Sequence, residues 1–390
     1  MAKDPEPWKP GELVRNIGEP LLLKEVNVHG VSAEACKGGG EVAIWVRMAI
    51  TSDAPHFHRV VENLAAVIET CATASECPVY LRRAQTVLLV MHPDNSAELW
   101  VDMAALATYG MMKRDMPGGS VVFESDIADV TGMDFPLVEI GETDRVVCLF
   151  RQDWRFGLFF DFNPDGKFDR EAMRRSLGDL YRTLRYRHLY EIVSDDGLLA
   201  VLTKAGWFPF VEIIGEFRSI ADSASAGFDI ADAEQQLTAR FDQARLERMF
   251  ARWMAKPHFA GKEALLRAAL NTYLSGEPAA VIKIALTEIE GILAAFYRAV
   301  HGRGAKIKKL LAFALDSAAQ KAGTPNTLLF PAAFGRYLNE YTFADFDPSG
   351  PPGHAGSRHA VGHGAADATS YTQVRALQAL LTLDQLSFYT

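Results

Sequence analysis

The sequence predicts an α+β protein, with a mixed α/β region at its N-terminal end and an all-α helical region at its C-terminal end. Up to about residue 190, runs rich in Val, Ile and aromatic residues are separated by Gly, Pro and Asn turn signals, a pattern typical of strands. Beyond that point strand signals almost vanish, and apolar residues recur at helical spacing. A chain of 390 residues is also long for one hydrophobic core. We therefore expect a mixed α/β domain at 1–190, a helical connector at 191–259 and an all-α domain at 260–390.

The N-terminal region is expected to begin with an extended arm, because Pro7, Pro10 and Pro20 oppose helix formation within residues 1–35. Helices are expected at 56–72 and 169–190, where apolar residues recur at helical spacing. The last two strands of the region should pair as a hairpin. The expected strands are 21–28, 41–50, 80–91, 97–103, 120–124, 138–140, 145–150 and 154–162.

The rest of the chain is expected to be helical. Its final segment offers Leu377, Leu380, Leu381 and Leu386 for burial. The expected helices are 198–206, 208–214, 231–254, 261–273, 279–300, 305–322, 331–341 and 371–388.

Composition indicates a reduced intracellular protein. The four cysteines, Cys36, Cys71, Cys77 and Cys148, show no Cys-x-x-Cys spacing. The N-terminal residues are charged and contain proline, unlike a signal peptide. No uncharged apolar run approaches the roughly 18–20 residues that a membrane span requires. We therefore expect a cytoplasmic protein without membrane association.

Residues 161–169 begin like a calcium-binding loop, with oxygen-bearing side chains at loop positions 1, 3, 5 and 9 and glycine at position 6. Ala172 occupies the position of the bidentate glutamate, however, and Pro164 lies inside the loop. We interpret the segment as a turn into a helix that Asp169 caps. His56 and His58 have no ligand partners nearby in the sequence, so we interpret them as helix-start or surface residues. No metal and no other cofactor is expected.

Two basic clusters stand out in a chain whose net charge is −9. Residues 170–188 contain six arginines with two interleaved tyrosines, and residues 298–309 contain five cations and no acidic residue. Such clusters hold a phosphate backbone by charge, and tyrosines stack on bases. Solvated helix faces are the alternative interpretation of each cluster. The candidate RNA-binding residues are Arg182, Arg185, Arg303, Lys306, Lys308 and Lys309.

Glu288 and Glu290 lie within the otherwise apolar segment 279–300 and point to different faces of a helix. A carboxylate brought into a core needs a cationic or hydrogen-bonding partner. Arg358, Arg336 and His359 are the candidate partners. A structural ion pair and a catalytic role both remain open at this stage.

Residues 357–364, Ser-Arg-His-Ala-Val-Gly-His-Gly, form the densest candidate site. Arginine is always charged and grips phosphate in a fork, and histidine titrates near neutral pH. Arg358 and His363 are five positions apart, which places them about 140° apart around a helix axis. One copy of the helix cannot bring both to one compact face, so we expect them to converge across a dimer or around a helix start. Ser357 is the expected cap of that helix.

This order of features resembles the HEPN superfamily, small α-helical domains found in prokaryotic defence, toxin and RNA-processing proteins. The shared features are a Thr-Glu-Ile-Glu-Gly helix at 287–291, a basic linker, further helices, Arg-His-x-x-x-His-Gly and a final hydrophobic helix. The family signature is an arginine, a polar residue, three variable residues and a histidine, and Arg358, His359 and His363 fill it. The resemblance covers roughly residues 260–390.

The resemblance implies a homodimeric, metal-independent endoribonuclease, acting in defence or stress. His363 would take the proton of a ribose 2′-hydroxyl, Arg358 would stabilise charge on the phosphoryl oxygens, and a histidine of the second copy would protonate the leaving oxygen. His359 would orient the site. RNA is the expected substrate because only RNA carries the 2′-hydroxyl. Residues 1–190 would sense, target or restrain the helical region through a regulatory partner.

Two other functions fit the same residues. The first is a non-enzymatic helical dimerisation or interaction module in which Arg358 and His363 are structural and Arg358 pairs with Glu288 or Glu290. The second is a metal-dependent hydrolase that uses His354, His359 and His363. The second is disfavoured, because matching Asp and Glu ligands are scarce nearby.

Overall fold

The structure is a computed structural model that describes residues 15–324, 326–345, 349 and 353–390. Most of the expected arm's prolines and part of the Gly/Pro-rich run at 347–356 lie outside the described residues. The chain forms two compact units. The first, called the sheet unit, comprises the described residues up to Tyr109 together with Thr131–Tyr186. The second, called the helical unit, comprises Gly110–Val130 and Arg187–Thr390.

The sheet unit is built on an antiparallel sheet. In the described part of the chain its six strands follow the order β1-β4-β3-β7-β8-β2, and each neighbouring pair is antiparallel. The hairpin expected at 145–162 is present as β7 and β8, in register from Val146 opposite Asp161 to Gln152 opposite Arg155. The strands are β1 Leu21–Leu23, β2 Arg47–Thr51, β3 Thr86–Met91, β4 Ala97–Val101, β7 Arg145–Gln152 and β8 Arg155–Asp161.

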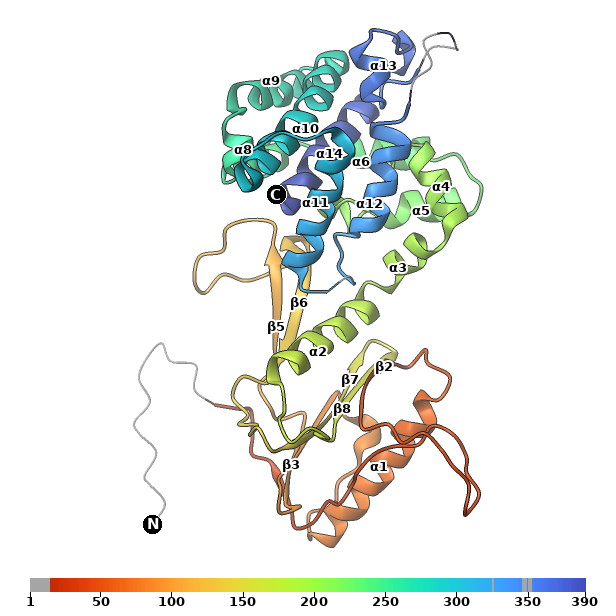
Figure 1. The fold of residues 1–390 in the computed structure, drawn as a ribbon, viewed down its shortest axis with the longest axis vertical. Coiled ribbons are helices and arrows are strands. Elements are labelled where there is room, and N and C mark those ends of the chain that lie inside the picture. The colour runs from red at the N-terminus through yellow and green to blue at the C-terminus, as the bar shows by residue number, and fades with distance from the viewer. Residues whose placement is uncertain (1–14, 325, 346–348, 350–352) are drawn as a thin grey trace. The chain divides into compact units, whose positions relative to one another are not determined.

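One helix covers each face of this sheet (Figure 1). Side chains alternate along a strand, so Val87 and Leu89 of β3 pack on helix α1 (Phe57–Ala74), whereas Leu88 and Val90 pack on helix α2 (Arg170–Arg185). Two separate apolar cores result, one on each face. Burial on both faces explains why β3 is a continuous apolar run.

Strands β5 (Ala107–Met112) and β6 (Ile127–Asp134) form a separate two-stranded sheet. The boundary between the two units crosses both strands. Within the sheet unit, β6 and α2 meet at Gly132 and Gly178: a Cβ added at Gly178 would lie 2.4 Å from the Gly132 Cα. The contact therefore requires glycine at position 178.

The predicted α+β class is confirmed, with differences in detail. Asp169 caps α2 as expected, because its carboxylate accepts a hydrogen bond from the Ala172 amide at 2.9 Å. Residues 120–124 and 138–140 are not strands. Val121, Val122 and Phe123 are instead exposed at the tip of the β5–β6 connection, which ends in the short 3-10 turn η2 (Glu124–Asp126). Residues rich in β-branched side chains remain a loop when neither face is covered.

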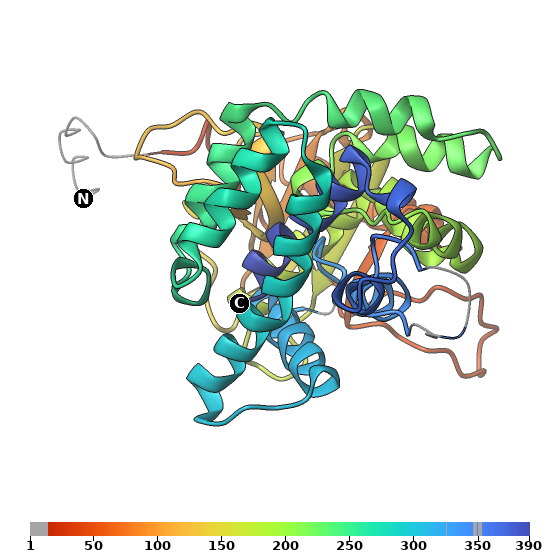
Figure 2. The same ribbon diagram turned by 90° about the horizontal axis from the view of Figure 1, so that it is seen from above.

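The helical unit gathers the remaining helices around α14 (Gln373–Tyr389) (Figures 1 and 2). Its helices are α3 Arg187–Ser194, α4 Asp196–Lys204, α5 Phe217–Ser225, α6 Ala231–Thr238, α7 Gln243–Met254, α8 Pro257–Ala260, α9 Glu263–Leu274, α10 Pro278–His301, α11 Ile307–Ala322, α12 Pro331–Tyr337 and α13 Arg358–Gly362.

Helix α14 is the core of this unit. All its residues from Ala376 onward are buried, and it contacts α6, α7, α9, α10 and α11. Its buried polar side chains are hydrogen-bonded: Gln385 accepts from the Val211 amide at 2.8 Å, and Ser387 donates to the Asp384 carbonyl of the same helix at 2.6 Å. A helix enclosed on all sides needs apolar residues all round, which is the pattern of its leucines.

The division into units differs from the three segments expected. Residues 191–259 belong to the same unit as 260–390, and residues 110–130 join them from within the expected N-terminal domain. The single helix expected at 231–254 is two helices, because Asp242 caps α7 by accepting from the Arg245 amide at 2.8 Å. The helix expected at 208–214 is only the short 3-10 turn η3 (Val211–Ile213).

Candidate functional site

The predicted Arg/His segment forms a short helix in the helical unit. Ser357 caps α13 as expected, because its hydroxyl accepts a hydrogen bond from the Ala360 amide at 3.3 Å. The same hydroxyl donates to the Ala344 carbonyl at 3.2 Å. Ala360 and Val361 are buried and fix the inner side of the helix. Arg358 and His359 are thereby held in a helix of only five residues, and His363 is its C-terminal cap residue.

Arg358 forms an ion pair with Glu290 of α10. Its side chain is 32% exposed and that of Glu290 is 36% exposed, so the pair lies at the surface rather than in the core. The Nη2 atom makes the contact, and the Nε atom is buried without a hydrogen-bond partner among the described residues. Since a guanidinium has five N–H donors, this pairing leaves further donors for a phosphate.

The two glutamates of α10 have different partners. Glu288 is buried and pairs with Lys262 at 2.8 Å, whereas Glu290 pairs with Arg358. They point to different faces of α10, as the sequence predicts. Glu290 is therefore the glutamate that orients Arg358, and Glu288 links α10 to the segment just before α9.

The histidines lie at increasing exposure along α13. His359 is half-buried, and His363 is exposed at the C-terminal cap. His354 stacks on Tyr341 with ring centroids 4.9 Å apart, and burial followed by the charge of Arg375 lowers the pKa of its imidazole. Among the residues that the structure describes, no three His, Cys, Asp or Glu side chains converge in a metal-binding arrangement.

The predicted RNA-binding cations divide into exposed and buried ones. Arg303, Lys306, Lys308 and Lys309 are exposed between the end of α10 and the first turn of α11. Glu290 is eleven residues before the end of α10, so about 17 Å of helix separates the Arg358 pair from this cluster. That distance is spanned by a few nucleotides of an extended strand.

The other predicted cluster lies in the sheet unit, on α2. Arg182 is only 1% exposed and pairs with Asp179, so its guanidinium is not available to a phosphate at the surface. The expectation that Arg182 binds RNA is therefore corrected. Arg185 is half-buried and lies 3.9 Å from Asp153. Helical spacing alone does not reveal which side of α2 faces the sheet.

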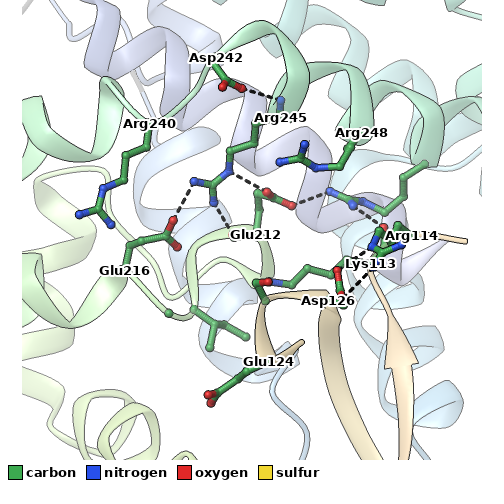
Figure 3. A pocket seen from close by; sticks show the side chains of 14 residues that line it. Lys113, Arg114, Glu124, Asp126, Glu212, Glu216, Arg240, Asp242, Arg245 and Arg248 are labelled. Atoms are coloured by element: carbon green, nitrogen blue, oxygen red, sulfur yellow. Dashed lines mark hydrogen bonds and ion pairs between the residues drawn. The ribbon is translucent and has the colours of Figure 1, made fainter. Parts of the chain in front are cut away.

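A charged cavity, which the sequence did not indicate as a site, lies within the helical unit (Figure 3). We call it the α7 cavity; its volume is about 710 Å³. Three stretches of chain build it: the β5–β6 connection, the turn before α5, and the α6–α7 turn with α7. Its charged lining residues are Lys113, Arg114, Glu124, Asp126, Glu212, Glu216, Arg240, Asp242, Arg245, Arg248 and Arg252.

Glu212 is the centre of the ion-pair network in this cavity. It accepts hydrogen bonds from Arg245 at 2.9 Å and from Arg252 at 2.9 Å (Figure 3). Burial alone would raise the pKa of its carboxyl, but the charges of Arg252, Lys113 and Arg245 outweigh burial and lower the pKa. Glu212 is thus a fixed anion that holds two arginines in place.

The signal for this cavity was present in the sequence of α7. Arg245, Arg248 and Arg252 occur at spacings of three and four, which puts them on one side of a helix. The partners of Arg245 and Arg252 lie 29 or more residues away in the sequence, so the sequence does not show which of the three arginines are neutralised. No helix within the described residues is long and apolar enough to cross a membrane.

Comparison of the chain with protein-family models, curated proteins and solved structures gave no match.

Proposed function

We propose that the protein is a metal-independent endoribonuclease of the HEPN type. The observation that carries the proposal is the surface ion pair between Arg358 and Glu290, next to two histidines on the same short helix. The pair holds a guanidinium at the surface by one of its nitrogens. It thereby provides a pre-positioned cation for a phosphodiester, with the His363 imidazole five residues further along the chain.

The chemistry assigned to these residues is transesterification. Neutral His363 takes the proton of a ribose 2′-hydroxyl, and the 2′-oxygen attacks the adjacent phosphorus. The bond from phosphorus to the 5′-oxygen breaks, and the histidine of a second copy protonates that oxygen. Arg358 stabilises the charge on the non-bridging oxygens. The products are a 2′,3′-cyclic phosphate and a 5′-hydroxyl.

Two further groups of residues have supporting roles in this proposal. Glu290 orients Arg358, and His359 shapes the approach to the phosphate. The exposed cations Arg303, Lys306, Lys308 and Lys309 contact the RNA backbone at a distance from the cut, where charge alone is sufficient. The mechanism needs one histidine as the base and a second as the acid. One copy supplies only His363 at the C-terminal end of α13, opposite Arg358, so a homodimer is required.

The test is RNA cleavage in the presence of EDTA. We expect the full chain to cut single-stranded RNA, and a substrate with 2′-deoxyribose at the cleavage site to resist. Arg358→Ala and His363→Ala should each reduce the rate by about 100-fold or more. Arg336→Ala and His301→Ala are the matched controls, because Arg336 is a half-exposed, ion-paired arginine and His301 an exposed histidine outside the site. Equal cleavage by all four variants would contradict the proposal.

A second candidate is a helical interaction module without catalytic activity, which the Arg358–Glu290 ion pair also supports. In that case Arg358 is a structural residue that fastens α13 to α10. Wild-type protein would then cut no RNA, and Arg358→Ala would lower the melting temperature or abolish dimerisation. Unchanged melting temperature and oligomeric state in Arg358→Ala would eliminate this second candidate.

A further inference from the structure

A second cavity adjoins the α7 cavity in the helical unit, with a volume of about 510 Å³. The two cavities share Lys113, Arg114, Arg248 and Arg252, and we call their union the α7 trough. Lys256 and Lys321 line the second cavity, and Asp115 is its acidic lining residue. Cations therefore dominate the end of the trough near α8 and α11.

Lys113 is the most informative residue of the trough. It is 8% exposed and lines both cavities, yet its ammonium makes no hydrogen bond or ion pair within the described chain. Burial lowers the pKa of its ammonium; the nearby charge of Glu212 opposes this effect, and that of Arg252 adds to it. Buried cations in proteins are normally paired, because desolvation is otherwise uncompensated. Glu212 is the nearby anion, but it is already hydrogen-bonded to Arg245 and Arg252, so the Lys113 ammonium keeps its donors for a ligand anion.

Other cations of the trough are also free to bind. The guanidinium groups of Arg240 and Arg248 make no hydrogen bond or ion pair within the described residues, and neither side chain carries a dashed line in Figure 3. Arg245, in contrast, pairs with Glu212 and Glu216. Arg252 pairs with Glu212 and Asp384. The trough thus combines fixed arginines with unpaired ones. Such pre-organisation lowers the cost of binding a phosphate group.

Lys256 and Lys321 are only partly engaged. Both donate hydrogen bonds to the Thr390 main-chain oxygen, at 3.1 Å and 2.5 Å, and Lys321 also donates to the Tyr389 oxygen. An ammonium has three donors, so each lysine retains capacity for a ligand oxygen.

The apolar and acidic residues of the trough indicate what the ligand carries besides phosphate. Met111, Met112 and Phe388 supply apolar surface in the second cavity. In the first cavity, the carboxylates of Glu124 and Glu216 would repel a continuous polyanion but accept hydrogen bonds from hydroxyl groups. The two volumes are in the range of sites for small ligands. The trough therefore suits a ligand with phosphates, hydroxyls and an apolar ring system, and a nucleotide has all three.

We infer that the α7 trough binds a nucleotide that carries two or more phosphates. The phosphates lie on Lys113, Arg248 and Arg252, the sugar hydroxyls contact the carboxylates, and the base lies on the apolar surface of the second cavity. This site is distinct from α13 and its Arg358–Glu290 pair, and the inference does not depend on ribonuclease activity.

The direct test is titration calorimetry of the full chain with ATP, GTP, CTP and UTP, then with the diphosphate, monophosphate and nucleoside of the tightest binder. We expect micromolar binding of at least one triphosphate, weaker binding of its monophosphate and none of its nucleoside. Tripolyphosphate is the probe for charge alone and should bind more weakly than the triphosphate. Equal binding of tripolyphosphate, or no binding of any triphosphate at millimolar concentration, would overturn the inference.

Substitutions then place the ligand. Lys113→Met and Arg248→Gln should each weaken triphosphate binding by about 10- to 100-fold, the loss expected for one charge-assisted hydrogen bond. Arg218→Gln is the matched control, because Arg218 is an exposed cation of the same unit that does not line the trough. Arg358→Ala should also leave binding unchanged, which separates this site from the proposed nuclease site.

Thermal unfolding without ligand distinguishes binding from a structural role. Because the buried ammonium of Lys113 makes no hydrogen bond or close ion pair within the described residues, Lys113→Met should leave the melting temperature unchanged or raise it. The triphosphate should raise the melting temperature of the wild type more than that of Lys113→Met. A Lys113→Met variant that is less stable and yet binds the triphosphate like wild type would show that Lys113 only supports the fold and would refute the assignment.

Discussion

Asp384 shows how a single buried charge organises the helical unit. It is fully buried on α14 and accepts hydrogen bonds from Arg252 at 2.7 Å and from Trp253 at 2.9 Å. Arg252 in turn binds Glu212 and the Lys113 carbonyl. One carboxylate thus connects the central helix to α7, to the turn before α5 and to the β5–β6 connection. Removing its charge leaves Arg252 buried with only one anionic partner.

We predict that Asp384→Asn destabilises the helical unit by about 3 kcal/mol, because breaking a buried ion pair leaves a charge uncompensated. Urea denaturation followed by circular dichroism measures the change. Asp222→Asn is the control: Asp222 pairs with Arg218 at 3.4 Å on the surface, and such pairs contribute at most about 1 kcal/mol. If the two variants lose the same stability, Asp384 does not have the organising role described.

Residues whose role depends on their immediate neighbours could be predicted from the sequence, and others could not. The caps Asp169 and Ser357 depend on amides three residues further on, so both were confirmed. The burial of Arg182 depends on which side of α2 faces the sheet, which the spacing of arginines does not reveal. Lys113 became informative only when segments distant in sequence enclosed it.

At the scale of elements, the contact between α2 and β6 depends on Gly178. A Cβ at this position would lie 2.4 Å from the Cα of Gly132, which is a backbone atom and cannot move aside as a flexible side chain could. We predict that Gly178→Ala destabilises the sheet unit by about 1–3 kcal/mol, the usual cost of overpacking, although alanine is the better helix former. Thermal unfolding monitored by near-ultraviolet circular dichroism measures the loss.

The control for this prediction is Gly261→Ala. Gly261 caps α8 with φ −64°, and the nearest atom to an added Cβ is 3.9 Å away. Alanine is therefore accommodated, and stability should stay the same or rise slightly. A Gly178→Ala variant as stable as Gly261→Ala would mean that α2 and β6 do not approach each other this closely.

The elements that the sequence predicted well are those with one strongly apolar side. Helices α1 and α10 were expected at 56–72 and 279–300, close to their observed bounds. The strand predicted at 120–124 does not form, because this apolar run lies at an exposed tip where no second surface covers it. The helical pattern over 231–254 does not predict the break between α6 and α7, because the break depends on the Asp242 cap rather than on the spacing of apolar residues.

At the scale of the molecule, the division into units does not follow the order of the chain. Residues 110–130 lie between two segments of the sheet unit in sequence but belong to the helical unit. Buried Asp129 accepts hydrogen bonds from the Thr327 hydroxyl and from the Leu328 amide at 3.3 Å. The change in composition along the sequence predicts a boundary near residue 190. It cannot reveal that a short segment of the helical unit lies within the sequence of the sheet unit.

This insertion leads to a prediction about fragments. A fragment of residues 187–390 contains the helices of the helical unit but lacks residues 110–130. The Thr327 hydroxyl and Leu328 amide lose the Asp129 carboxylate, and a buried guanidinium, Arg252, loses the Lys113 carbonyl. Each unsatisfied buried donor costs about 1–3 kcal/mol, which is a large part of the stability of a typical domain.

We therefore expect the fragment to unfold without a sharp transition and to bind a hydrophobic dye. Co-expression with residues 105–136 should restore cooperative unfolding, and the same segment with Asp129→Ala is the matched control that should restore it less well. Near-ultraviolet circular dichroism and thermal scans measure the difference. A fragment of residues 187–390 that unfolds as sharply as the full chain, without the added segment, would show that residues 110–130 lie against the helical unit without contributing to its stability.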